Sequence, residues 1–232
     1  MKQITPTAWL VAMGAANAIL LADDDEGGLV LVDAGFPDKQ QAVFDAIAEL
    51  GRQPTDLKHL VFTHSHPDHI GSAAAIIDRC GASTWMHPAD VATAESGGPF
   101  RPMHPTKRLP QRLLYRIYWR EDERLQPIKI DNEINDGDVL PVAGGLEVIH
   151  TPGHSAGHVA LLRPSDRLLM VGDVGSNMVG IADPLGYEDL PTLRDSQAKL
   201  GQVQCDAAAF GHGFAIKHDA SKRLAKAWSA PR

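Results

Sequence analysis

Four side chains that can bind a metal ion lie within six positions of the segment "THSHPDHIG", residues 63–71. They are His64, His66, Asp68 and His69. Imidazole nitrogen and carboxylate oxygen are ligands of zinc and related divalent cations, and catalytic zinc sites leave one position open for water. A pair of histidines alone can also lie on a protein surface without a metal. The cluster therefore indicates a metal ion but does not identify a reaction.

Three further donors follow apolar, strand-like segments later in the chain. His154 comes after the Pro-Gly turn of "HTPGHSAGH", Asp173 ends the segment "LLMVGD", and His212 lies between two glycines in "AAAFGHG". A strand end positions a side chain rigidly, and a flanking glycine lets the backbone approach a site closely. We therefore expect ligands from four loops to converge.

Seven donors exceed what one tetrahedral ion needs, and they fit two ions that share a ligand. We expect one site to consist of His64, His66 and His154. We expect the other to consist of Asp68, His69 and His212, with Asp173 bridging both ions. Two cations roughly 3.5–4 Å apart can hold a hydroxide between them and stabilise the oxygens of a displacement reaction. Zinc is the expected metal, with iron or manganese as alternatives.

The hydrophobic pattern around these donors predicts two similar halves. In the first half we expect strands near residues 7–13, 16–22, 29–33, 57–64 and 83–87, and helices near 37–51, 68–81 and 88–96. In the second half we expect strands near 128–130, 146–150, 158–162, 167–171 and 205–210, and helices near 190–202 and 219–228. This order predicts two packed β-sheets with helices outside them, in one domain spanning residues 1–232.

Residues 97–126 differ in composition and are expected to form a helical insertion. Its arginines recur every four residues, so a helix would align them in a stripe: Arg108, Arg112, Arg116, Arg120 and Arg124. The insertion could be a lid that binds a substrate carboxylate or phosphate, a contact between two copies of the chain, or a solvated face. Large apolar residues of a small-molecule pocket are expected here and in a later loop: Phe100, Met103, Tyr115, Tyr118, Trp119 and Tyr187.

The order of the donors resembles that of the metallo-β-lactamase-fold hydrolase superfamily. Its HxHxDH motif corresponds to residues 64–69, and His154, Asp173 and His212 follow in the superfamily's order. The segment "NAILLADDDEGGLVLVDAG" resembles its N-terminal hairpin, so the resemblance spans residues 7–213. It implies an α+β fold, the four-layer αββα sandwich, and assigns Asp33 to the support of the metal-binding loop through hydrogen bonds to a ligand.

The resemblance implies a dinuclear hydrolase that cleaves a small ester, thioester or lactone with a metal-bridging hydroxide. It also implies that Asp68 orients the hydroxide and passes a proton to the leaving group. The chain looks similar to the lactonase and glyoxalase II branches, with departures from both. Lactonases carry a tyrosine where this chain has Ser176, and the glyoxalase II helical domain does not fit the 20 residues after His212.

Two alternatives stay open. One is an oxidoreductase like the persulfide dioxygenases, with a single iron held by residues that match His64, His154 and Asp173. The other is promiscuous hydrolysis of β-lactams, although zinc β-lactamases usually lack the bridging aspartate.

The composition of the chain restricts which classes of molecule it is expected to bind and in which compartment. The formal charge of −7 over 232 residues argues against binding of nucleic acid. Two distant cysteines, Cys80 and Cys205, fit a reducing cytoplasm better than a disulfide framework. The apolar segment 8–22 is shorter than a membrane span and is better explained by two strands of a hairpin than by a signal peptide. We expect a cytoplasmic enzyme that acts on a small molecule, away from membranes.

Overall fold

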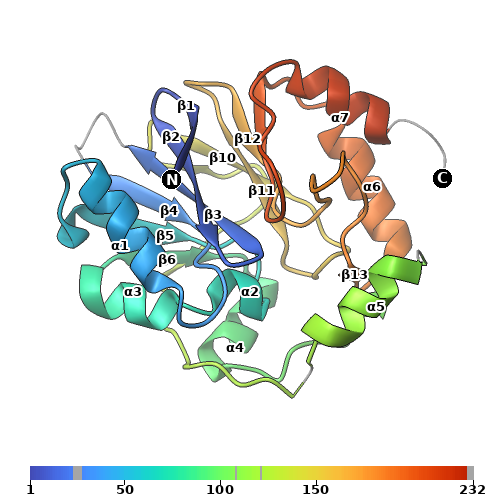
Figure 1. Ribbon diagram of the computed structural model, residues 1–232, viewed down its shortest axis with the longest axis horizontal. Coiled ribbons are helices and arrows are strands. Elements are labelled where there is room, and N and C mark those ends of the chain that lie inside the picture. Colours follow the sequence, from blue (N-terminus) through green and yellow to red (C-terminus); the bar gives the residue numbers. More distant parts are fainter. Residues whose placement is uncertain (23–27, 108, 121, 229–232) are drawn as a thin grey trace.

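Two β-sheets face each other, and helices cover their outer faces in the computed structural model (Figure 1). The structure describes residues 1–22, 28–107, 109–120 and 122–228. In the helix that follows residue 108, it does not describe the side chains of residues 109–111, 114 and 118. None of the helices in these ranges is long and apolar enough to cross a membrane.

The first sheet has seven strands in the order β1-β2-β3-β4-β5-β6-β8. Its strands are β1 (Lys2–Thr5), β2 (Ala8–Met13), β3 (Ala16–Ala22), β4 (Leu29–Val32), β5 (Leu57–Val61), β6 (Ser83–Met86) and β8 (Asn132–Glu133). Pairing is antiparallel from β1 to β4 and parallel from β4 to β8. The parallel strands β4 and β5 thus direct their carboxyl ends, and the residues that follow them, to the same edge.

The second sheet has five strands in the order β14-β12-β11-β10-β9. Its strands are β9 (Val139–Leu140), β10 (Leu146–His150), β11 (Val159–Arg163), β12 (Leu168–Met170) and β14 (Ala207–Ala209). Only the β12–β14 pairing is parallel among these strands. A separate two-stranded ribbon joins β7 (His104–Pro105) to β13 (Gly186–Tyr187).

The helices form the outer layers and one end of the molecule. They are α1 (Gln40–Glu49), α2 (Pro67–Ile70), α3 (Ala73–Cys80), α4 (Pro88–Ser96), α5 (Leu109–Tyr118), α6 (Leu190–Leu200) and α7 (Ala220–Trp228), with a 3₁₀ turn at Pro54–Asp56. Figure 1 shows α1 and α3 outside the first sheet, and α6 and α7 outside the second.

Three hydrophobic clusters separate the four layers. Alternation along β4 shows the pattern, because Leu29 and Leu31 pack toward the helices while Val30 and Val32 pack toward the second sheet. Along β12, Leu169 packs toward α6 and α7. The predicted αββα sandwich is confirmed. Both cysteines, Cys80 and Cys205, are free and buried.

Three predicted elements differ from the structure. No strand forms at residues 128–130; Ile128 packs instead against the first core cluster, and β8 begins at Asn132. The helix expected over 68–81 is split near Gly71, where a Cβ atom would lie 2.4 Å from Pro37. Helix α5 ends at Tyr118, so Arg120 and Arg124 lie beyond it and the predicted arginine stripe is wrong over that part, while Arg108 lies outside the described residues.

One buried cation ties the two sheets together at their edge. Arg163 on β11 is 2% exposed. Its guanidinium donates to the carbonyl oxygens of Ala143 at 2.8 Å and Ala22 at 2.7 Å, and to the hydroxyl of Thr7 at 2.9 Å. Ala22 ends β3 and Thr7 lies between β1 and β2 in the first sheet, whereas Ala143 follows β9 in the second, so the guanidinium joins the two sheets and supplies donors to these carbonyl and hydroxyl groups.

We expect Arg163→Met to lower the free energy of unfolding by about 3 kcal/mol, because it leaves buried acceptors without donors. Urea denaturation measures the change. The matched control is Arg167→Met, which removes only an exposed ion pair with Asp206 and should change stability by less than about 0.5 kcal/mol. Equal effects of the two substitutions would contradict this role of Arg163.

Candidate metal centre

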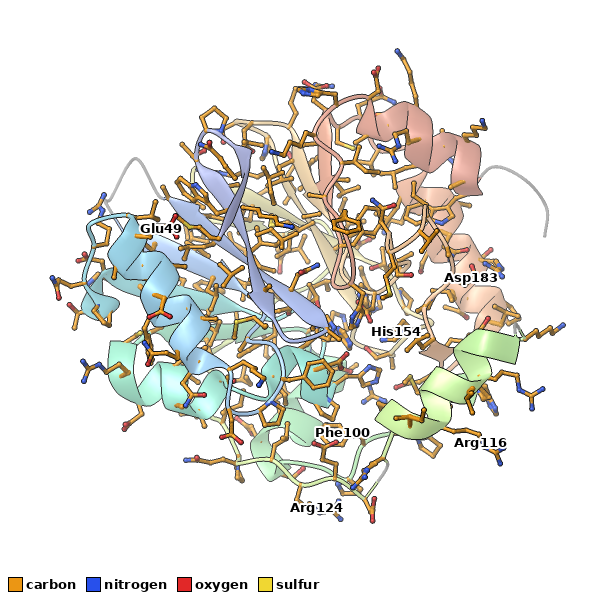
Figure 2. The ribbon with its side chains drawn as sticks, in the orientation of Figure 1. Glu49, Phe100, Arg116, Arg124, His154 and Asp183 are labelled. Carbon is orange, nitrogen blue, oxygen red and sulfur yellow. The ribbon has the colours of Figure 1, made fainter. Side chains whose placement is uncertain are left out.

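All seven predicted donors meet where four loops leave the two sheets. Residues 64–69 follow β5, His154 follows β10, Asp173 follows β12, and His212 follows β14. In Figure 2, His154 lies near the middle of the molecule, between the inner ends of the two sheets. The prediction that the donors converge from four strand ends agrees with this geometry.

The donors divide into two groups, each with its atoms within 4.8 Å of one another. One group consists of His64, His66 and His154, all buried. In it, Nδ1 of His66 lies 3.0 Å from Nε2 of His154. The second group consists of Asp68, His69, Asp173 and His212. Here Nε2 of His212 lies 3.1 Å from both Asp68 Oδ2 and Asp173 Oδ2.

Asp173 lies between the two groups. Its Oδ2 atom is 3.6 Å from His154 Nε2, and its Oδ1 atom is 3.5 Å from His69 Nε2. Close backbone approach makes this possible, because a Cβ atom on Gly211 would fall 2.1 Å from Asp173 Oδ1. The expected role of glycine beside the donors thus has a direct steric reason.

The spacing and the unpaired atoms both fit metal ions. Nitrogen ligands about 2.05 Å from a tetrahedral zinc ion are roughly 3.3 Å apart, close to the separations found here. Within the described part of the chain, four buried donor atoms here lack a hydrogen-bond partner: Nε2 of His64, His66 and His69, and Oδ1 of Asp173. Leaving such atoms unpaired is costly unless another group binds them.

A buried carboxylate orients two of the imidazoles. Asp33 Oδ2 accepts a hydrogen bond from His69 Nδ1 at 2.8 Å, and the carboxylate also accepts from the Thr63 hydroxyl at 2.8–3.0 Å. Because that hydroxyl proton points to Asp33, Thr63 Oγ1 accepts from His64 Nδ1 at 3.0 Å. Both rings therefore present Nε2 lone pairs to the site, which agrees with the supporting role expected of Asp33.

Backbone carbonyls orient two other rings in the same way. His154 Nδ1 donates to Gly186 O, and His212 Nδ1 donates to Ala15 O, both at 2.9 Å. A carbonyl oxygen only accepts, so Nδ1 carries the proton and Nε2 faces the other donors.

Burial and neighbouring charges set the protonation of the rings. Burial, followed by the nearby histidines, holds the pKa of His64 and His66 well below the usual range, so both are neutral at pH 7. Burial also opposes the charge on His69 and His212, but the carboxylates, Asp173 foremost, outweigh it and raise the pKa of both rings. This second group thus attracts positive charge strongly.

His158 is a residue of the site that the sequence analysis did not identify. Its ring is fully buried, and Nε2 accepts a hydrogen bond from the backbone N–H of Asp173 at 2.8 Å. Its Nδ1 therefore donates to Thr151 Oγ1, also at 2.8 Å. Gly172 has φ +58°, and a Cβ atom there would lie 2.5 Å from His158 Nε2. The second histidine of "GHSAGH" was the available signal.

The predicted pocket residues are brought together only in part. Three ring contacts centre on Trp119, with distances given between ring centroids. Trp119 meets His66 edge to face at 4.9 Å, Tyr115 stacks on Trp119 at 6.2 Å, and Phe100 lies 6.3 Å from Trp119. Met103 joins them, since its carbonyl accepts from the Tyr115 hydroxyl at 2.7 Å. Tyr187 is different, because its side chain is buried in the core cluster beneath α6. The side chain of Tyr118 lies outside the described residues.

Known proteins are similar to this chain in sequence. The family model of the metallo-beta-lactamase superfamily matches residues 12–212. The Bacillus subtilis protein named "Probable metallo-hydrolase YflN" is 27% identical over 80% of this chain and 75% of its own length. The hydroxyacylglutathione hydrolase of Rhizobium meliloti is 27% identical over 85% of this chain, which spans 62% of that enzyme.

Solved structures agree on the fold. The Rm3 metallo-beta-lactamase superposes with a TM-score of 0.75 and 20% identity over 98% of this chain and 90% of its own. The matched region of the family model includes every donor of both groups and both sheets' central strands. The chain therefore belongs to the metallo-beta-lactamase superfamily.

Proposed function

We propose that this metal-dependent hydrolase binds two divalent cations, zinc by preference, and cleaves a small ester, thioester or lactone. The observation that carries the proposal is the position of Asp173, whose Oδ2 lies 3.6 Å from His154 in one group and 3.1 Å from His212 in the other. One carboxylate can therefore serve both groups. The names of the hydrolase relatives support the same reaction class.

Two bound cations would lower the pKa of a water molecule and polarise the carbonyl of the substrate. Asp68 is the carboxylate placed to handle protons beside them. Its side chain is 23% exposed, against 7% for Asp173, so it lies nearer the open side of the site. Burial raises the pKa of Asp68, but His69 and His212 outweigh burial and hold it well below the usual range, so Asp68 is ionised at pH 7.

A groove next to the site offers a place for the substrate. It has a volume of about 360 Å³, within the range of small-molecule sites, and is lined by Phe36, Ile117, Arg120, Asp122 and Glu123. Burial, and then the charge of Asp68, raise the pKa of Glu123, and this influence of Asp68 supports a role for the groove beside the metal centre. Phe36 and Ile117 would contact the apolar part of an acyl group, and Arg120 would bind a carboxylate on it.

Changing Asp68 to Asn should lower kcat by about 10²–10⁴-fold, because an amide cannot accept the proton that a carboxylate accepts. Initial rates on a panel of esters, thioesters, lactones and β-lactams measure the effect, with metal content determined for each sample. Asp78→Asn, at an exposed carboxylate on α3, is the control and should leave the rates unchanged. Full activity of the Asp68 variant would contradict the proton-handling role.

Metal analysis separates the proposed chemistry from the alternative with one iron. We expect two zinc ions per chain by mass spectrometry of the metal content. Removal with a chelator should lower the thermal midpoint by about 10 °C, since a ligand at 1,000 times its Kd stabilises by about 4 kcal/mol. One iron per chain, with oxygen consumed in the presence of a persulfide, would instead identify a dioxygenase.

The groove makes a separate prediction about the substrate. Arg120→Met should raise KM about tenfold for an acyl substrate with a terminal carboxylate and leave its kcat unchanged, because one charge-assisted contact of about 1.4 kcal/mol is lost. Arg116→Met is the matched control, since Arg116 extends outward from α5 (Figure 2). For an uncharged ester of equal length, KM should be the same with Arg120→Met as with Arg116→Met. If Arg120→Met raises KM equally for the charged and the uncharged ester, Arg120 is not a carboxylate ligand.

A further inference from the structure

A second buried carboxylate, distinct from the metal donors and from Asp33, joins two metal-binding loops. We infer that Asp90 is a positioning residue that holds the loops of the His64–His66–His154 group at the separation a metal ion requires. Asp90 lies in the first turn of α4 and is 0% exposed. This inference builds on the proposed two-metal site but does not depend on which substrate is hydrolysed.

The contacts of Asp90 reach both loops. Its Oδ2 atom accepts from the backbone N–H of Ser65 at 2.8 Å and from the Ser155 hydroxyl at 3.1 Å. Its Oδ1 atom accepts from the backbone N–H of Gly157 at 3.0 Å. Ser65 is the residue between His64 and His66, and Ser155 directly follows His154. One rigid group thus fixes the backbone on both sides of the site.

Only a carboxylate meets these donors well. Two N–H groups and a hydroxyl point at Asp90, and an ionised carboxylate is the side chain that offers acceptors alone. An asparagine would place an NH₂ group against at least one of them. The fit also needs a glycine, because a Cβ atom at position 157 would fall 2.5 Å from the Asp90 carboxyl group.

Arg101, in the insertion at residues 97–126, completes the set of donors around Asp90. The Arg101 guanidinium pairs with Asp90 Oδ1 and donates to Ala89 O at 2.8 Å, which compensates the buried negative charge. Its Nε atom donates to Glu188 Oε1 at 2.7 Å, and Glu188 Oε2 accepts from the backbone of Ala156 at 2.9 Å. Arg101 directly follows Phe100, which packs with Trp119 and Tyr115 beside His66. The same network therefore connects these aromatic residues to the loop of His154.

The two buried carboxylates therefore support different parts of the centre. Asp33 acts on rings, through His69 directly and through Thr63 on His64. Asp90 acts on the backbone that carries His66 and His154. Loss of Asp90 should thus weaken one metal-binding step selectively.

The test is a zinc titration against a competing chelator, with intact protein and Asp90→Asn. A His66→Ala variant first identifies the binding step that belongs to the His64–His66–His154 group. We expect Asp90→Asn to raise the Kd of that step by about 10–100-fold, the usual effect of removing a group that orients metal ligands, and to change the other step by less than about threefold. Asp33→Asn should instead weaken both steps, because Asp33 orients His69 directly and His64 through Thr63.

A matched control and a milder variant keep the result decisive. Asp131 also accepts from a backbone N–H and a hydroxyl, both of Thr84, but lies away from the site, so Asp131→Asn should change neither Kd. Ser155→Ala removes one donor to Asp90 and should weaken the same step by about threefold, even if Asp90→Asn fails to fold by circular dichroism.

Unchanged Kd values in a folded Asp90 variant, or equal weakening of both steps, would overturn the inference. Zinc binding at fewer than two sites in the unaltered protein would instead refute the proposed two-metal function.

Discussion

The metal centre depends on hydrogen bonds made on the far side of its imidazole rings. A histidine presents a lone pair to a metal only when its other nitrogen carries the proton, and each Nδ1 of His64, His69, His154 and His212 faces an oxygen that must accept. Those oxygens belong to Thr63, Asp33 and Ala15, which adjoin strands of the first sheet, and to Gly186 of the ribbon. The packing of the fold therefore determines the protonation of the donors as well as their positions. A small shift between the two sheets would misorient the His212 ring, which follows β14 of the second sheet but donates to Ala15 beside the first.

Charge balance explains why such a centre can be buried. Burial alone disfavours both ionised carboxylates and protonated imidazoles, and Asp68 and Asp173 remain ionised because His69 and His212 stand beside them. In the absence of other cations these rings hold protons, as the raised pKa of each indicates. Divalent cations would replace those protons and would also bind Nε2 of His64, which has no partner in the described part of the chain, and Nδ1 of His66, which lies 3.0 Å from His154 Nε2. Acid therefore competes with metal at the carboxylate-rich group first.

Local sequence predicted those parts of the fold that rest on local rules. Short apolar runs located β2, β3 and β4, and the spacing of small residues and histidines located all seven donors. The errors arose where tertiary contacts outweighed local pattern. The arginine period suggested a long helix, but the chain leaves α5 after Tyr118 and turns Trp119 onto His66. Asp90 and His158 went unrecognised because the loop residues that they contact lie far along the chain or outside any repeat. The partners of Asp90 in the metal-binding loops lie 25 to 67 residues away, and those of His158 lie 7 to 15 residues away.

Under the proposed function, the insertion at residues 97–126 would contribute to substrate specificity. Its two ends have different roles: Arg101 is fixed between two buried or half-buried carboxylates, whereas Arg112 and Arg116 are exposed. A single stripe of equivalent arginines, as the sequence suggested, would have made a uniform positive surface. The structure instead leaves Arg120 at the groove and attaches the start of the insertion to the loop of His154. Through Arg101, which directly follows Phe100, the aromatic cluster beside His66 and the loop of His154 therefore belong to one connected set of contacts.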